Sequence, residues 1–491
     1  MSRVHEDQRA LLLRVARRAM VDYGLEPDYP KEALAEADAM RPAALAGDGL
    51  ADLRELPWCS IDNHDSLDLD QLTAVHAPEA QGAATTVLVA IADVSGLVAA
   101  GSAVDRHAET NTTSVYTPAR IFAMLPERLS TGLTSLNPGE DRAAMVVEMT
   151  VGRDGEIEQE RVCEALVHNR AKLVYHEVGA WLEGGGKAPD GVTAVPGLAA
   201  ALRLQDEVAQ RLRERRHEHG ALELETIEPR ARLDGGGVQA LVADRQDRAT
   251  ELIEDLMIAA NGVVARFLEA RRSPVMRRVV RSPERWERIV QLAAGHGVAL
   301  PGEPDSAALN AFLVARRKAD PLRFPDLSLS IVKLLGRGEY VVSLPGQKTE
   351  GHFGLAVDRY SHSTAPNRRF PDLITQRLVK AALASSAPPY SYERLAELAE
   401  HCTQQEDNAQ KVERRVRKSA AACFLADRVG DDFAGVVTGA SAKGTWARAF
   451  EPPVEGRVVE GEDGLDVGDK VRVRLIRADP ERGFIDFARL E

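Results

Sequence analysis

Four aspartates crowd into nine residues of this chain: Asp62, Asp65, Asp68 and Asp70. So many carboxylates repel one another unless a positive group lies among them. Asp62, Asp68 and Asp70 are spaced by six and two residues, so in an extended segment their side chains would point to one side. Hard carboxylate oxygens arranged in this way suit Mg²⁺ or Mn²⁺. The acidic stretch is therefore a candidate metal site.

Three alternative interpretations compete with a catalytic metal site. A cluster of Asp, Asn and Ser most often forms a solvated turn. An EF-hand does not fit, because its sixth position lacks the turn glycine and its twelfth is Thr73 instead of a glutamate. Asp68 and Asp70 also resemble the paired aspartates of haloacid-dehalogenase-type phosphatases. In those enzymes the pair ends an apolar strand, whereas here the polar residues 62–66 precede it.

Further blocks follow the acidic stretch in a characteristic order. They are the apolar run Val87–Ser95, the segment Thr113–Pro118 (TSVYTP), Met124–Ser130 (MLPERLS), Glu254–Asn261 (EDLMIAAN) and His352–Asp372, which ends in RRFPD. In this order and spacing they closely resemble the catalytic RNB domain of the ribonuclease II family, over about residues 55 to 430. The resemblance implies a metal-dependent 3′-to-5′ exoribonuclease that hydrolyses single-stranded RNA to nucleoside 5′-monophosphates.

The same resemblance assigns the acidic residues. Asp62, Asp68 and Asp70 match three of the family's four acidic positions, and Asp70 matches the one most closely tied to catalysis. Gln71 stands where most members have the fourth aspartate. A glutamine carbonyl still accepts a hydrogen bond from metal-bound water, but one negative charge is lost. We therefore expect a weakly held second ion and a dependence on millimolar Mg²⁺ or on Mn²⁺.

Two arginines lie in the block that matches the family's SPIRRYPDL motif, at Arg368 and Arg369. A guanidinium beside the metals would clamp the scissile phosphate and stabilise charge in the transition state. The alignment gives this role to Arg368. Arg369 is assigned a structural or phosphate-binding role.

Other RNA contacts are also implied by the resemblance. Tyr116 matches an aromatic residue that stacks on bases near the 3′ end, and such stacking is indifferent to sequence. The family's phenylalanine after the histidine is Ser363 here, so one stacking platform is expected to be missing. Either Glu254 or Asp255 would contact the terminal sugar, and the sequence does not decide between them.

Secondary-structure patterns predict an α+β fold in three parts. Residues 1–54 carry two short helices, at about 6–22 and 29–37, in place of the cold-shock barrels of many family members. Residues 55–430 form a catalytic domain with a strand-rich first half and helices near 198–216, 249–272, 282–296, 373–384 and 406–427. Alternating strands and glycine turns in residues 431–491 predict an S1-type OB barrel that binds RNA.

Composition narrows the function further. The net charge of −13 argues against indiscriminate coating of nucleic acid, so cations must be concentrated locally. Two groups are candidates for an RNA path: Arg266, Arg271, Arg272, Arg277, Arg278 and Arg281, then Arg414, Arg415, Arg417 and Lys418. No apolar run is long enough to span a bilayer, and no targeting signal is visible. We expect a cytoplasmic monomer without an obligate protein partner.

The main rival function is an RNA-binding regulator whose nuclease centre has decayed. Gln71 and Ser363 favour this rival, whereas the retained Asp62, Asp68, Asp70 and Arg368 weigh against it more strongly. A phosphatase-like hydrolase is a distant third interpretation.

Overall fold

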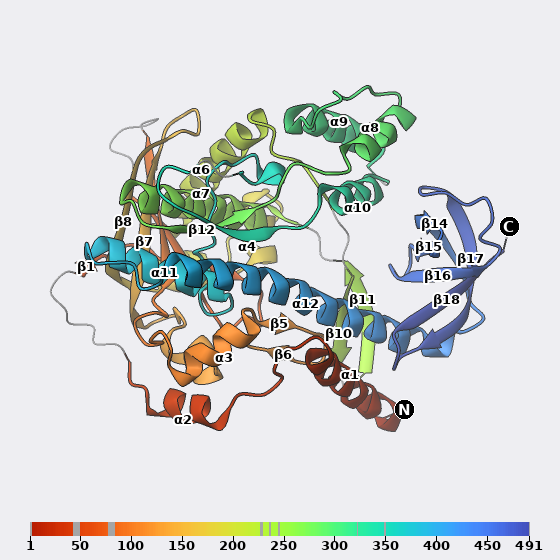
Figure 1. Cartoon of the computed structure of the whole chain (residues 1–491), viewed down its shortest axis with the longest axis horizontal. Coiled ribbons are helices and arrows are strands. Elements are labelled where there is room, and N and C mark those ends of the chain that lie inside the picture. Colours follow the sequence, from red (N-terminus) through yellow and green to blue (C-terminus); the bar gives the residue numbers. More distant parts are fainter. Residues whose placement is uncertain are drawn as a thin grey trace.

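The larger part of the molecule contains a seven-stranded mixed sheet, which lies toward the left in Figure 1. The computed structural model describes residues 2–42, 50–76, 84–225, 229–234, 237–243, 246–321, 323–347 and 350–490. The strand order is β1-β8-β7-β4-β3-β2-β9. These strands are β1 (Ala51–Asp52), β2 (Cys59–Asp62), β3 (Gln71–Val75), β4 (Thr85–Ala92), β7 (Asp141–Val151), β8 (Ile157–His168) and β9 (Ala171–Val174).

The middle of this sheet is buried on both faces. The β4 sequence TTVLVAIA is an almost continuous apolar run, as expected for a strand that is covered on both sides. Helices α6 (Leu198–Glu218) and α7 (Arg248–Ala270) pack on the sheet and on each other. Asp247 begins α7 by accepting a hydrogen bond from the Thr250 amide (2.8 Å). Both helices match their predicted ranges to within two residues.

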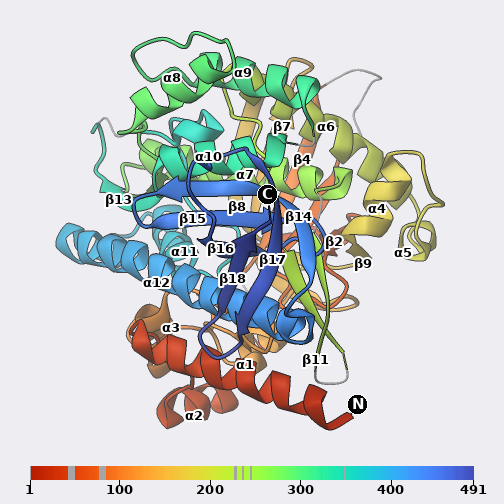
Figure 2. The same cartoon turned by 90° about the vertical axis from the view of Figure 1, so that its right-hand side faces the viewer.

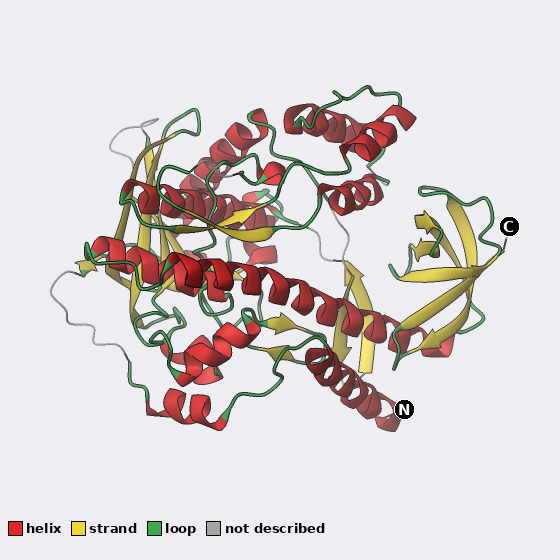
Figure 3. Ribbon diagram, viewed as in Figure 1, coloured by secondary structure: helices red, strands yellow, loops and turns green. Residues whose placement is uncertain are grey.

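Most of the other helices lie to the right of this sheet in the view of Figure 3. The helices are α3 (Ala103–Asn111), α4 (Tyr175–Leu182), α5 (Asp190–Ala194), α8 (Trp286–Gly295), α9 (Ser306–Ala319), α10 (Phe324–Leu335) and α11 (Phe370–Leu383). Three small ribbons pair β5 (Val115–Tyr116) with β6 (Ile121–Phe122), β10 (Pro229–Asp234) with β11 (Gly237–Ala243), and β12 (Val275–Val279) with β13 (Glu339–Ser343). Helices α8 to α10 have a small core of their own, and the apolar spacing of the sequence predicts only α8 of these three.

The longest helix, α12 (Tyr392–Leu425), has 34 residues and connects the two halves of the molecule. It contacts α1 (Ser2–Asp22), β13 and the C-terminal barrel (Figure 2). Only its second half was predicted, because the first half is rich in charged and polar residues. The second N-terminal helix, α2 (Lys31–Ala39), packs against α3, so both predicted N-terminal helices are present.

The C-terminal strands form a closed five-stranded barrel, as predicted. The strands are β14 (Asp432–Ser441), β15 (Gly444–Ala449), β16 (Glu455–Glu460), β17 (Lys470–Asp479) and β18 (Phe484–Arg489). Its core includes Val437, Leu475 and Phe487, together with Ala422 and Leu425 from the end of α12. The barrel and the helix therefore share one apolar core. Across the described ranges, no helix has the length and apolar character that crossing a bilayer requires.

A buried ion pair also joins the barrel to α10. Arg448 Nη2 lies 2.6 Å from Asp326 Oδ1, and each side chain is only 10% exposed. Burial raises the pKa of Asp326, and the charge of Arg448 opposes this shift. The pair thus neutralises a carboxylate that would otherwise be costly to bury.

Replacing Arg448 by methionine is expected to lower the free energy of unfolding by about 3 kcal/mol, because Asp326 is left buried and unpaired. Urea unfolding monitored by circular dichroism measures the change. The matched control is Arg457→Met, which removes an exposed arginine of the adjacent strand β16. The double variant D326L/R448M should regain most of the loss, and equal stabilities of R448M and R457M would contradict the prediction.

Candidate active site

Asp70 is the most deeply buried carboxylate of the acidic stretch, with 3% of its surface exposed. It lies just before β3, and its main-chain carbonyl accepts a hydrogen bond from the Ala92 amide at the end of β4 (2.9 Å). Asp70 Oδ1 accepts from the Asn367 amide (2.9 Å). Asp70 Oδ2 has no hydrogen-bond partner, and Arg368 Nε lies 3.5 Å from it. Burial raises the pKa of Asp70 to about 7, although the charge of Arg368 and the Asn367 hydrogen bond oppose this shift.

Asp62 and Asp68 are half-buried at the two ends of the acidic loop. Asp62 ends β2, and its Oδ1 accepts from the Asn63 amide (2.7 Å) and from Ser66 Oγ (2.8 Å). Burial raises the pKa of Asp68, the charge of Arg368 lowers it, and the charge of Asp62 raises it further. These three groups therefore share one electrostatic environment.

The carboxylate oxygens of Asp62, Asp68 and Asp70 are of the chemical type that a hard divalent cation prefers. Asp70 Oδ2 is a buried carboxylate oxygen without a donor, and a bound cation would satisfy it. The carboxylates do not form a closed cage, however. Over the ranges that the structure describes, no three His, Cys, Asp or Glu side chains are grouped as metal ligands. Asp62, Asp68 and Asp70 thus supply suitable oxygens without the convergence of a complete ligand set.

Gln71 begins β3, and its side chain links this strand to the loop that carries Arg368. Gln71 Nε2 donates to the Thr364 carbonyl (2.5 Å). Because a carbonyl only accepts, the amide nitrogen must face it, which leaves Oε1 as the free acceptor of the side chain. An aspartate could not make this hydrogen bond. The glutamine thus has a structural partner that is distant in the sequence and that no local pattern indicates.

The structure separates the two adjacent arginines. Arg369 Nη2 lies 2.7 Å from Oδ1 of the fully buried Asp372, near the start of α11. Arg369 Nη2 also lies 3.4 Å from Thr364 Oγ1. Arg368 instead keeps 43% of its side chain exposed beside Asp70. Of the two, only Arg368 has a guanidinium that faces both the acidic residues and solvent.

Tyr116 projects from the β5–β6 ribbon near the acidic loop and is 39% exposed. Its amide donates to Glu413 Oε1 on α12 (2.8 Å). Burial of the ring raises the pKa of its phenol, and Arg368 and Asp68 are close enough for their charges to act on it in opposite directions. The predicted stacking residue therefore lies beside the predicted metal and phosphate ligands.

Helix α7 distinguishes the two candidate sugar contacts. Asp255 is 2% exposed and forms an ion pair with Arg216 of α6. Burial raises the pKa of Asp255 to about 6, and the charge of Arg216 opposes the shift. Glu254 is exposed, with Gln246 Nε2 3.5 Å from its carboxylate. Asp255 thus has a partner within the protein, and Glu254 remains accessible.

Ser363, which occupies the position of the family's phenylalanine, is buried and cannot act as a platform. Its amide and its Oγ both donate to Asn261 Oδ1 of α7, at 2.8 Å each. The substitution therefore replaces an aromatic side chain by a hydrogen bond that ties the Arg368 loop to α7.

Two residues near the acidic loop were missed by sequence reasoning. Lys172 Nζ donates to the main-chain carbonyls of Ser66 (2.5 Å) and His64 (3.5 Å), so a cation does lie within the acidic stretch. Tyr175 begins α4. Burial is the main cause that raises the pKa of its phenol, and the negative charge of Asp62 raises this pKa further. Both come from the β9–α4 segment, which the parallel pairing of β9 with β2 brings to the loop. No local sequence pattern reveals that pairing.

Most arginines of the predicted RNA path have acidic partners within the chain. Arg266 pairs with Glu160, Arg277 with Glu269, Arg278 with Glu406, Arg281 with Glu339 and Glu350, and Arg415 with Asp22. These ion pairs neutralise much of the charge that the sequence had suggested for phosphate binding.

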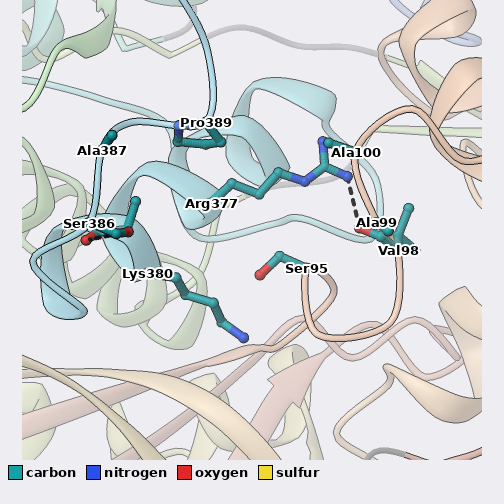
Figure 4. A pocket seen from close by; sticks show the side chains of 10 residues that line it. Ser95, Val98, Ala99, Ala100, Arg377, Lys380, Ser386, Ala387 and Pro389 are labelled. Atoms are coloured by element: carbon teal, nitrogen blue, oxygen red, sulfur yellow. Dashed lines mark hydrogen bonds between the residues drawn. The ribbon is translucent and has the colours of Figure 1, made fainter.

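A shallow depression between the loop after β4 and the end of α11 lies apart from the acidic site (Figure 4). Its two cations, Arg377 and Lys380, have acidic partners: Arg377 pairs with Asp105 (2.6 Å) and Lys380 with Asp93 (2.6 Å). None of its lining residues belongs to the acidic site.

The mixed sheet, the acidic loop and the closed barrel define an RNB protein with a C-terminal S1 domain. A family model of the RNB domain matches residues 50–385, and a model of the RNase II-type exonuclease C-terminal S1 domain matches residues 431–490. The chain belongs to the RNB family.

Known proteins are similar over nearly the whole chain. Ribonuclease R of Escherichia coli (strain K12) is 31% identical over 504 aligned residues, which cover 95% of this chain and 59% of that protein. This chain thus spans less than two thirds of that relative's length. Mycoplasma genitalium RNase R in complex with ribose methylated single-stranded RNA shares the fold, with a TM-score of 0.87 and 21% identity over 98% of this chain and 78% of that one. Yeast Ssd1, a pseudonuclease, has a TM-score of 0.69 and 17% identity over 96% of this chain and 57% of that one.

Proposed function

We propose that this protein is a metal-dependent 3′-to-5′ exoribonuclease that hydrolyses single-stranded RNA and releases nucleoside 5′-monophosphates one at a time. The observation that carries the proposal is the buried Asp70, whose Oδ2 has no hydrogen-bond partner and lies 3.5 Å from Arg368 Nε. A buried carboxyl oxygen without a hydrogen-bond donor, beside a half-exposed arginine side chain, suits a site that receives a cation and a phosphate together. The similarity to ribonuclease R supports the same reaction class.

Each residue of the site has a proposed role. Asp62, Asp68 and Asp70 would hold Mg²⁺, for which Mn²⁺ substitutes, and the free Oε1 of Gln71 would accept a hydrogen bond from an ion-bound water. The bound ions would activate water and stabilise the leaving oxygen. Arg368 clamps the scissile phosphate, and Tyr116 stacks on a base. Glu254 is the better candidate for the terminal sugar because Asp255 is paired with Arg216.

We also propose a role for each part of the chain. Residues 1–54 form a helical segment, residues 55–430 the catalytic domain, and residues 431–491 an S1-type barrel that contacts RNA. The match of the S1 family at 431–490 supports the barrel as a separate part, whereas the RNB match at 50–385 begins before residue 55 and includes β1, which belongs to the seven-stranded sheet. We further propose that the protein acts on RNA in the cytoplasm as a monomer without an obligate protein partner.

The second candidate function is an RNA-binding regulator without nuclease activity. The glutamine at position 71 and the buried Ser363 favour it, since both depart from the family pattern at the site. The similarity to Ssd1, which is named a pseudonuclease, shows that the fold alone does not decide activity.

A time course on 5′-labelled single-stranded RNA separates the two functions. With Mg²⁺ or Mn²⁺, we expect a ladder that shortens from the 3′ end, and chelator should abolish it because the carboxylates need an ion to act. Intact RNA under every metal, combined with a shifted band on a native gel, would instead establish the RNA-binding regulator.

Gln71→Asp is expected to lower the Mg²⁺ concentration at half-maximal activity several-fold, because the added carboxylate strengthens cation binding. The same change should cost about 1 kcal/mol of stability, because the Thr364 carbonyl loses its donor. Metal titrations of hydrolysis and thermal unfolding measure the two effects. Gln71→Asn is the matched control, since it shortens the side chain without adding charge. An unchanged metal requirement in Gln71→Asp would contradict this prediction.

A further inference from the structure

The β5–β6 ribbon presents two exposed apolar side chains next to each other. In its register Val115 pairs with Phe122 and Tyr116 with Ile121. Val115 and Phe122 are buried in the core shared by α1 and α12. Tyr116 and Ile121 face the opposite side, where they are 39% and 54% exposed. The two residues thus form a small exposed apolar surface on one side of the ribbon, which is a candidate for contact with a ligand.

The ribbon is held rigidly at its tip. Thr117 Oγ1 donates to the Arg120 carbonyl (2.6 Å), and the amides of both residues complete the turn through hydrogen bonds of 3.1 and 3.2 Å. At its base, Ser114 Oγ accepts from the Met124 amide (2.9 Å). A rigid support allows a side chain to bind a flat ligand with little loss of conformational entropy.

The base of the ribbon is also bonded to the loop that carries the catalytic arginine. The Ser114 amide donates to the Arg368 carbonyl (3.0 Å), and Thr113 Oγ1 lies 3.2 Å from the same oxygen. The phenol of Tyr116 is near enough to Asp68 and Arg368 for both charges to affect its pKa. The apolar pair is therefore continuous with the proposed phosphate and metal site.

We propose that Ile121 is a further RNA-binding residue, which packs against the nucleobase adjacent to the one that stacks on Tyr116. This inference rests on the proposed function and adds a second base position to it. Directly opposed residues of an antiparallel ribbon have Cβ atoms roughly 5 Å apart. One side of the ribbon thus offers two adjacent apolar side chains to successive bases of the strand whose phosphate would lie at the acidic loop.

The test compares binding of short oligoribonucleotides by the inactive variant D70N with binding by D70N/I121A, measured by fluorescence anisotropy. We expect Ile121→Ala to weaken binding roughly fivefold, because an aliphatic side chain offers a smaller face than an aromatic one to a base. The matched control is Val332→Ala, which trims another exposed β-branched residue on α10, 37% exposed. It should leave binding unchanged.

A comparison of intact RNA with RNA that lacks bases tests whether the loss of binding comes from contact with a base. On RNA whose two 3′-terminal nucleotides lack bases, the D70N and D70N/I121A proteins should bind equally, since no base remains for Ile121 to contact. A persistent difference on the abasic RNA, or equal binding on intact RNA, would overturn the assignment. In the active background, Ile121→Ala should raise KM for short RNA and leave kcat nearly unchanged. Failure of wild-type protein to degrade RNA would instead refute the proposed exonuclease, which is a separate result.

Discussion

Replacing Asp70 by asparagine is expected to reduce RNA hydrolysis by roughly a thousandfold or more and to leave RNA binding intact. The asparagine carbonyl can still accept the hydrogen bond from the Asn367 amide, so the loop keeps its anchor. Its amide nitrogen, however, takes the place of Oδ2, which is the buried oxygen without a partner. An NH₂ group cannot bind a cation and would lie against the Arg368 guanidinium. The change therefore removes the chemistry and preserves the shape of the site.

Single-turnover cleavage of labelled RNA and native-gel binding measure the two properties of D70N separately. The matched control is Asp65→Asn, because Asp65 is an exposed aspartate of the same loop. It should retain nearly full activity. Residual hydrolysis by D70N at more than about a tenth of the wild-type rate would show that this carboxylate is not essential.

Replacing Arg368 by alanine is expected to lower kcat roughly a thousandfold, comparable with the loss of an arginine that stabilises charge on a transferring phosphoryl group. Arg368→Lys should recover only part of the activity, because an ammonium keeps the charge but lacks the forked donors of a guanidinium. The effect should fall on kcat more than on KM, since the contact strengthens as charge builds on the phosphate.

Two other arginines serve as controls for Arg368. Arg359 lies in the same block, His352–Asp372, as Arg368. It is exposed and pairs with Glu269 (3.0 Å), so its replacement by alanine should leave kcat unchanged. Arg369→Ala is expected to lower thermal stability, because Asp372 is fully buried and would lose its cation. Equal kinetic effects of the three substitutions would contradict the separate roles that the geometry gives to Arg368 and Arg369.

Local patterns predicted those parts of the fold that are determined by short-range sequence. The apolar spacing of α7 and the continuous apolar run of β4 both correspond to the observed elements, because burial of one or both faces dominates their sequences. The alternating C-terminal strands likewise form the predicted closed barrel. The first half of α12 was missed, since its buried residues are separated by many charged ones that face solvent.

The candidate site was only partly predictable because its geometry is tertiary. Sequence blocks singled out Asp70 and Arg368 as candidates, but nothing in them indicates that Arg368 lies half-exposed beside Asp70 while Arg369 is paired with Asp372. The choice between Glu254 and Asp255 depends on Arg216, which comes from a different helix. Lys172 reaches the acidic loop only through the parallel pairing of β9 with β2. Ion pairs between residues far apart in the sequence similarly neutralise several arginines that were candidates for an RNA path.

Helix α12 fixes the distance between the C-terminal barrel and the acidic site. It is continuous from Tyr392 to Leu425, it shares a core with the barrel at one end, and it supports the Tyr116 ribbon through Glu413. An α-helix advances about 1.5 Å and turns about 100° with each residue. A single-residue insertion between Glu413 and Ala421 would thus swing the barrel to another side of the molecule, whereas a longer insertion close to whole turns would preserve its direction and lengthen the span. The distance between the barrel and the acidic site can therefore change, with the direction of the barrel preserved, only by insertions of about whole helical turns.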